Sequence, residues 1–185
     1  MLKELEEKTV SPLANDPQIF SKYTENLGLD LNTSNFYLIL GFDEEFHSFT
    51  PSPVYTVIFL YPIGEKDGFL QTRYNNPLPV EQIPTPRPWF SLQTVNNACG
   101  TMAALHAIMN NLDHVKLKPD SWLSNFAKET ANMTPEQRAV LIHNDKTLFS
   151  FHEHAAEQSN LSIPEKVTEH YITFIEVGGR LWELD

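Results

Sequence analysis

The distribution of apolar and polar positions in the first third of the chain predicts one helix and two strands. Residues Asp16 to Leu27 predict a short helix, because a proline stands in its first turn and Gly28 directly follows its last residue. The apolar, β-rich runs Phe36–Leu40 and Val54–Tyr61 predict strands. The second run is almost continuously apolar, which is typical of a buried central strand.

Three further helices are predicted in the second half of the chain. They begin at Cys99, Ser121 and Thr134, and the first two end near Asn110 and Ala131. The third starts with Thr-Pro-Glu-Gln, in which the threonine and the glutamine three residues later can form a reciprocal capping box. We expect this third helix to run to about residue 156.

Two segments are predicted as surface loops, and the chain closes with a predicted hairpin. Residues Gly64 to Pro88 contain five prolines outside regular structure, and Glu157 to Glu165 are polar with little apolar content. The final stretch, HYITFIEVGGRLWELD, consists of two alternating segments joined by Gly178 and Gly179, a pair that suits a two-residue turn.

Length and composition predict a single soluble domain. The 185 residues are 41% hydrophobic and 20% charged, and no apolar run approaches the length of a membrane helix. The N-terminus lacks a secretory signal, and the single cysteine cannot form an internal disulfide, so we expect a reducing compartment, the cytoplasm or the nucleus. The net charge of −11 argues against nucleic-acid binding and favours either a basic partner or general solubility.

The only cysteine stands at the start of a predicted helix. Apolar positions Met102, Leu105 and Met109, together with His106, predict one core-facing side for this helix. If Asn96 or Asn97 caps it, Cys99 lies in the first turn, where unpaired N–H groups and the helix dipole favour a thiolate. The alternative is that Cys99 is a small buried packing residue, since free cysteines are often buried.

The register of the predicted hairpin brings a histidine next to an acid. With the two glycines as the turn, Ile175 faces Trp182 and Ile172 faces Asp185, while His170 lies on the same side as Ile172. His170 and Asp185 are then diagonal neighbours whose Cα atoms are roughly 7–8 Å apart, close enough for a side-chain hydrogen bond. The alternative is a surface histidine near the chain end.

A cysteine at a helix start and a histidine oriented by an acid are the components of a cysteine hydrolase. Gln93, just before the cysteine, could donate its side-chain amide to an oxyanion, or could be an ordinary loop residue. His152, Glu153 and His154 do not predict a metal site, because two histidines separated by one residue point to different sides of a helix. His106 is expected to be a core histidine, and no metal or other cofactor is predicted.

Two motifs and their order resemble the ubiquitin C-terminal hydrolase family of cysteine deubiquitinases. These are QTVNNACGT and HYITFIEVGGRLWELD, with LGLDLNTSNFYLILGFDEEF, FLYPIGEK and MTPEQRAV in the family's order between and before them. The resemblance implies an α+β fold, an antiparallel sheet flanked by helices with a papain-like site. It implies that Cys99 is the nucleophile, His170 the general base and acid, Asp185 the orienting acid and Gln93 the oxyanion donor.

The resemblance also implies the substrate and the surface that binds it. The expected activity is release of small adducts or short peptides from the ubiquitin C-terminus through a thioester, by a monomer without a cofactor. The basic ubiquitin tail suits an acidic enzyme. Residues expected to contact ubiquitin belong to the N-terminal segment and to the loop that resembles the family's loop over the active site: Pro12, Leu13, Glu157, Gln158, Ser159, Asn160 and Leu161.

Two departures from the family pattern leave alternatives open. Leu38 stands where the family places an acid that meets an arginine of ubiquitin, so a hydrolase of a ubiquitin-like modifier is one alternative. Family members continue with Gly-Arg after the position of Asp185, so we expect one catalytic domain, residues 1–185, without the family's last elements. Because chain ends are mobile unless tied down, an inactive ubiquitin-binding remnant is the other alternative.

Overall fold

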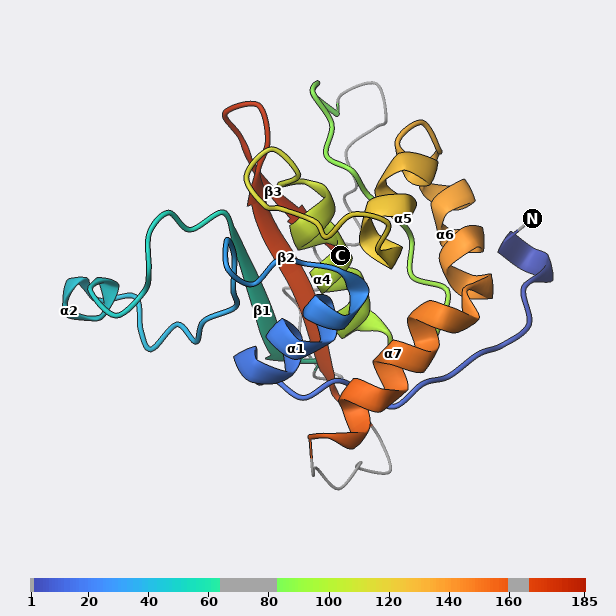
Figure 1. The fold of residues 1–185 in the computed structure, drawn as a ribbon, viewed down its shortest axis with the longest axis horizontal. Coiled ribbons are helices and arrows are strands. Elements are labelled where there is room, and N and C mark those ends of the chain that lie inside the picture. Colours follow the sequence, from blue (N-terminus) through green and yellow to red (C-terminus); the bar gives the residue numbers. More distant parts are fainter. Residues whose placement is uncertain (1, 64–82, 160–166) are drawn as a thin grey trace.

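The fold combines a small antiparallel sheet with a group of helices (Figure 1). A computed structural model describes residues 2–63, 83–159 and 167–185. The sheet consists of β1 (Thr56–Pro62), β2 (Glu169–Glu176) and β3 (Leu181–Leu184), with β2 in the middle and both pairings antiparallel. None of the helices in the described part of the chain combines the length and the apolar composition needed to cross a membrane. The sheet and helices confirm the expected α+β class.

The sheet and the other helices together enclose one central helix, α4. α4 packs on β2, where Thr173 Oγ1 donates to the carbonyl of Ala103 at 3.1 Å, and other helices lie on its far side (Figure 1). Every residue of α4 is buried, so the prediction of a single apolar face is wrong: the core encloses this helix on all sides. The helical elements are η1 (Leu2–Glu4), α1 (Pro17–Leu27), α2 (Glu44–His47), α4 (Cys99–Met109), α5 (Trp122–Thr130), α6 (Pro135–Asn144) and α7 (Lys146–Glu157).

The boundaries of α1 follow from local chemistry, as predicted. Asp16 caps its start by accepting a hydrogen bond from the backbone N–H of Gln18 at 2.7 Å. Gly28 ends it with φ +120, and its N–H donates to the carbonyls of Thr24 and Glu25. A Cβ atom at Gly28 would lie 2.2 Å from the side chain of Ser121, so the glycine also permits close packing against the start of α5.

The helix expected from Thr134 to about residue 156 is two helices, α6 and α7. The capping box is present, since Gln137 N donates to Thr134 Oγ1 and Thr134 N donates to the Gln137 side chain. Asp145 interrupts the helix with ψ 98, and its carboxylate accepts from the backbone N–H of Leu148 and from Trp122 Nε1, each at 2.8 Å. These two hydrogen bonds stabilise a new N-cap in place of a continuous helix.

One of the two predicted strands is absent, and the other is present but does not lie at the centre of the sheet. Residues 36–40 form no strand, and Tyr37, Leu38 and Leu40 are each more than half exposed. The run predicted as a central strand forms β1, which lies at the edge of the sheet with Phe59 44% exposed. Residues 31–42 and part of β1 both line a groove of about 650 Å³, and β1 pairs with β2 rather than with the first apolar run. The predicted loops fall largely on residues 64–82 and 160–166, outside the described residues.

Candidate active site

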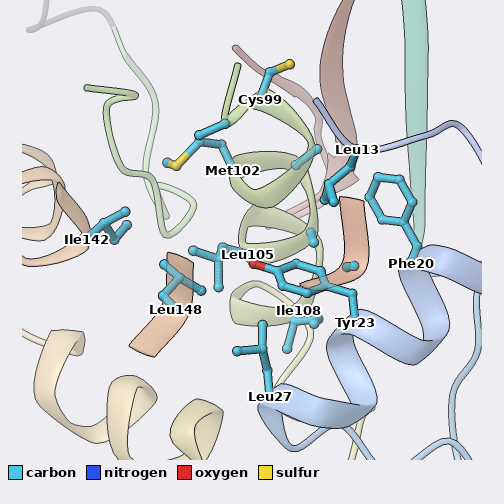
Figure 2. Packing of buried hydrophobic residues seen from close by; sticks show 14 of the residues in the cluster. Leu13, Phe20, Tyr23, Leu27, Cys99, Met102, Leu105, Ile108, Ile142 and Leu148 are labelled. Carbon is cyan, nitrogen blue, oxygen red and sulfur yellow. The ribbon is translucent and has the colours of Figure 1, made fainter. Parts of the chain in front are cut away.

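Cys99 is the first residue of α4 and lies at the edge of the core, next to the surface. It is 7% exposed, and Figure 2 shows its sulfur pointing beyond the helix end, away from the other labelled core side chains. The preceding turn contains Asn97 at φ 63, and Ala98 is the N-cap residue, without a capping side-chain oxygen. The prediction that Asn96 or Asn97 caps α4 is therefore wrong. The Asn96 side chain instead donates to Glu7 and Thr9, so no asparagine side chain occupies the first-turn N–H groups.

His170 lies on β2 and pairs with Asp185, as the hairpin register predicted. Ile175 faces Trp182, and Gly178 and Gly179 form the turn with φ +64 and +75. His170 Nε2 lies 2.5 Å from Asp185 Oδ1, with the two side chains 21% and 19% exposed. The acid therefore fixes one edge of the imidazole and leaves Nδ1 for another partner.

The second partner of His170 is Cys99. The pKa of His170 is raised to about 9, first because Asp185 accepts its hydrogen bond and second because the Cys99 side chain is hydrogen-bonded to it. Both contacts favour the imidazolium over the neutral ring. The packing of α4 on β2 brings the thiol and the imidazole together, although 71 positions separate them in the sequence. The described residues thus include a thiol, an imidazole and a carboxylate in series.

Gln93 lies near this series, in the segment leading to Cys99. Its side-chain amide donates to the carbonyl of Val95 at 2.9 Å, which ties it to the turn before α4. An amide nitrogen carries two N–H groups, so one remains to donate to a ligand. Gln93, His170 and Asp185 line one small cavity of about 10 Å³, together with Ser91, Met102, Ala103, His106, Tyr171 and Leu184.

His106 shares that cavity but is a buried, neutral histidine, as expected. It is 2% exposed, and its Nε2 lies 3.2 Å from the carbonyl oxygen of Ser91. Burial lowers its pKa to about 4, which disfavours a role as a base that must accept a proton near neutral pH.

Tyr61 contacts His170, although nothing in the sequence near either residue predicts this contact. Tyr61 of β1 is the register partner of His170, and its ring meets the imidazole edge-on with centroids 5.9 Å apart. The pairing of β1 with β2 joins segments more than a hundred residues apart, so no local pattern could have revealed this contact.

The residues expected to contact ubiquitin differ in exposure. Pro12 is half-buried, whereas Leu13 is 4% exposed and belongs to the core, so its side chain is not on a surface that a partner could meet. Glu157 and Gln158 are exposed at the end of α7, and Ser159 Oγ donates to the carbonyl of Ala156. The remaining two, Asn160 and Leu161, lie outside the described residues.

The His152-Glu153-His154 motif splits between the interior and the surface. His152 is completely buried and bonded to Thr101 and to the carbonyl of Ser11, while the exposed His154 contacts Gln158. The two imidazoles therefore do not converge on a common point. Within the described residues, no group of three potential metal ligands is found.

Comparisons with known proteins agree with this geometry. Residues 10–185 match the model of ubiquitin carboxyl-terminal hydrolase, family 1. The chain is 36% identical to ubiquitin carboxyl-terminal hydrolase 3 of Arabidopsis thaliana over 174 residues, 94% of this chain and 74% of that protein. It is 29% identical to human ubiquitin carboxyl-terminal hydrolase isozyme L1 over 176 residues, 95% of this chain and 78% of the isozyme.

A solved structure has the same fold. The crystal structure of the Trichinella spiralis UCH37 catalytic domain bound to ubiquitin vinyl methyl ester superposes with a TM-score of 0.69 at 20% identity. The match covers the whole of this chain and 77% of that one.

Proposed function

This chain belongs to the ubiquitin carboxyl-terminal hydrolases of family 1, and we propose that Cys99, His170 and Asp185 are its catalytic residues. The protein is a deubiquitinating enzyme of the cysteine hydrolase type. The observation that supports the residue assignment best is the placement of His170, which is hydrogen-bonded to Asp185 and lies close enough to Cys99 for the Cys99 side chain to raise its pKa. This is the order of groups that activates a thiol as a nucleophile.

The first half of the reaction forms a thioester. His170 holds the proton of the Cys99 thiol, and the thiolate sulfur attacks the carbonyl carbon at the C-terminus of ubiquitin. The carbonyl electrons move to oxygen, where the Gln93 amide and the N–H of Cys99 can stabilise the oxyanion. When the tetrahedral intermediate collapses, His170 gives its proton to the leaving amine, and the C–N bond breaks.

The second half regenerates the enzyme. His170, now neutral, takes a proton from a water molecule, whose oxygen attacks the thioester carbonyl. Collapse of this intermediate breaks the C–S bond, releases the C-terminal carboxylic acid of ubiquitin, which loses its proton to solvent, and returns the thiolate beside the imidazolium. Asp185 keeps the ring oriented through both halves by holding Nε2, so that Nδ1 is left to exchange the proton with the sulfur.

The substrate is ubiquitin carrying a small adduct or a short peptide at its C-terminus. Pro12 and the exposed end of α7, with Glu157 and Gln158, are proposed to contact ubiquitin. The net charge of −11 favours approach of a basic tail. All proposed catalytic groups come from one chain, which supports action as a monomer, and the lone cysteine suits the reducing cytoplasm or nucleus.

A second candidate substrate is a ubiquitin-like modifier. Leu38 is 57% exposed and apolar, so it can contact a partner but cannot pair with an arginine. Competition between ubiquitin and ubiquitin-like vinyl sulfone probes for labelling of Cys99 distinguishes the two. Preferential labelling by ubiquitin supports the primary proposal, and preferential labelling by a ubiquitin-like probe would replace it.

Hydrolysis of a fluorogenic amide at the ubiquitin C-terminus tests the proposed function. We expect turnover by the native chain, loss of nearly all turnover in Cys99→Ser and His170→Ala, and unchanged turnover in Ser150→Ala, an exposed control on α7. Ubiquitin binding is measured in parallel. Binding without turnover by the native chain would overturn the proposal in favour of an inactive ubiquitin-binding protein.

A further inference from the structure

A segment near the N-terminus contacts the neighbours of both proposed catalytic residues. This N-terminal segment, residues 8–13, lies beside the turn that leads to Cys99. The N–H of Val10 donates to the carbonyl of Asn96 at 3.1 Å, and the N–H of Asn96 donates to the carbonyl of Lys8 at 2.8 Å. These two hydrogen bonds attach the segment to Asn96, which lies three residues before the nucleophile.

The end of the N-terminal segment packs between α4 and β2. Leu13 covers Gly100, the residue after Cys99, so closely that a Cβ atom at that glycine would lie 3.1 Å from the Leu13 Cβ. On the other side, Tyr171, the residue after His170, donates its hydroxyl to the Leu13 carbonyl at 3.2 Å. Leu13 therefore touches the neighbour of the thiol and the neighbour of the imidazole at once.

A buried histidine on α7 holds the middle of the same segment. His152 Nε2 lies 2.6 Å from the carbonyl oxygen of Ser11, and the imidazole is fully buried. A carbonyl oxygen can only accept, so Nε2 carries the proton and donates it to Ser11. Its neighbour Glu153 accepts from the Ser11 N–H at 3.0 Å, so α7 binds both backbone groups of this residue.

The other ring nitrogen of His152 reaches the catalytic helix. Nδ1 lies 2.7 Å from Thr101 Oγ1, two residues after Cys99, and the Thr101 hydroxyl lies 2.8 Å from the hydroxyl of Tyr23. Burial lowers the pKa of His152, which keeps the ring neutral and leaves Nδ1 as an acceptor for the threonine proton. Thr101 can then accept a hydrogen bond from the Tyr23 hydroxyl. The hydrogen bonds therefore run in one direction, from Tyr23 to Thr101 and from Thr101 to His152 Nδ1.

We propose that His152 is a positioning residue for the hydrolase reaction, because its Nε2–H fixes the N-terminal segment that holds Gly100 of α4 and Tyr171 of β2 at a set separation. The proposal rests on the catalytic roles of Cys99 and His170 given above. Without this hydrogen bond the Ser11 carbonyl loses its buried partner, and the segment moves away from the site. The thiol and imidazole then spend less time at the spacing that proton transfer needs.

Two amide substitutions test the two hydrogen bonds of the His152 ring one at a time. In His152→Gln the side-chain nitrogen occupies a position equivalent to Nε2 and can still donate to Ser11. In His152→Asn the side-chain oxygen occupies the position of Nδ1 and can accept from Thr101, but nothing reaches Ser11. Both variants bury an uncharged amide at the same helix position, although asparagine is one methylene shorter than glutamine.

The measurements are kcat and KM on the fluorogenic ubiquitin amide and hydrogen exchange of residues 8–13. We expect kcat/KM of His152→Asn to lie about ten- to a hundredfold below that of His152→Gln, with faster exchange in the segment only in the asparagine variant. Equal kcat/KM in the two variants would overturn the proposal. A lower kcat/KM in His152→Asn with unchanged exchange would also overturn it, because the loss of activity would then not be caused by movement of the segment.

A milder variant covers the case in which neither amide variant folds. Glu153→Ala removes the acceptor of the Ser11 N–H and leaves the buried ring in place, and alanine suits a helix. We expect faster exchange in residues 8–13 and a few-fold lower kcat/KM, and no change in either value would overturn the proposal. Thr130→Val is the control for general destabilisation, because it removes a fully buried hydroxyl that has no contact with the N-terminal segment. If the native chain hydrolyses nothing, the proposed function fails, while the exchange data still show whether His152 holds the segment.

Discussion

Replacing Asp185 by asparagine removes the charge beside His170 while keeping the size of the side chain. The amide oxygen can still accept the hydrogen bond from Nε2, so the ring keeps its orientation when the amide is placed correctly. What changes is the stabilisation of the imidazolium. The Asp185 hydrogen bond is the largest cause of the raised pKa of His170, which is about 9 against an ordinary value of 6.5.

The expected change in the pKa of His170 follows from its value in the native enzyme and from the exposure of the His170–Asp185 pair. The difference between about 9 and 6.5 corresponds to about 3 kcal/mol of preference for the imidazolium. Asp185 and Cys99 share this preference, and both members of the His170–Asp185 pair are about a fifth exposed, so solvent screens the charge. We assign about 1–2 kcal/mol to the Asp185 carboxylate, which corresponds to a fall of about one unit in the His170 pKa.

The pH dependence of kcat/KM on the fluorogenic ubiquitin amide tests this reasoning. The active form carries a thiolate and an imidazolium, so activity falls at alkaline pH as His170 loses its proton. We expect this alkaline limb near pH 9 in the native enzyme and about one unit lower in Asp185→Asn. An alkaline limb at the same pH in both proteins would refute the account, because the carboxylate would then not stabilise the imidazolium.

Three further predictions concern other parts of the molecule. Gln93→Ala should lower kcat by about 10²–10³ with ubiquitin binding unchanged by calorimetry, and unchanged turnover would remove Gln93 from the oxyanion role. Leu13→Ala should lower the free energy of unfolding in urea by about 2–5 kcal/mol, while the exposed control Leu112→Ala should change it by less than about 0.5 kcal/mol; a loss below about 1 kcal/mol for Leu13→Ala would contradict its place in the core. His106, with a pKa of about 4 in the folded state, stays neutral while the unfolded chain takes up a proton near pH 6.5; stability should therefore fall as the pH drops from about 6.5 to 4, by about 3 kcal/mol for this residue. Urea unfolding at both pH values should show a smaller loss in His106→Gln, and an equal loss would show that His106 is not responsible.

The histidine–acid pair could be predicted from sequence because a hairpin is a local structure. Gly178 and Gly179 set the turn, and the period of two along each strand then decides which side chains share a face. Those two facts make His170 and Asp185 diagonal neighbours on one face, where their side chains form the contact of 2.5 Å. The caps of α1 and α6 were predictable for the same reason, since each cap depends on residues within four positions of it.

The failures involve residues whose structure depends on distant partners. Residues 36–40 have the composition of a strand, but no strand of the described residues pairs with them, and Tyr37, Leu38 and Leu40 are exposed. Asp145 ends α6 because it caps α7 and also binds Trp122 of α5, a contact across 23 positions. Local propensity contains no information about either outcome.

The sequence by itself determined which groups this protein can use: one thiol at a helix start, one imidazole and one carboxylate on paired strands, and the motifs of a hydrolase family. Only the tertiary structure decided that the thiol reaches the imidazole, because that contact depends on how α4 packs against β2. The same packing buried Leu13 and set His152 against residue 11. Hydrogen bonds between near neighbours follow from backbone geometry, whereas contacts between distant segments depend on the shape of the whole core.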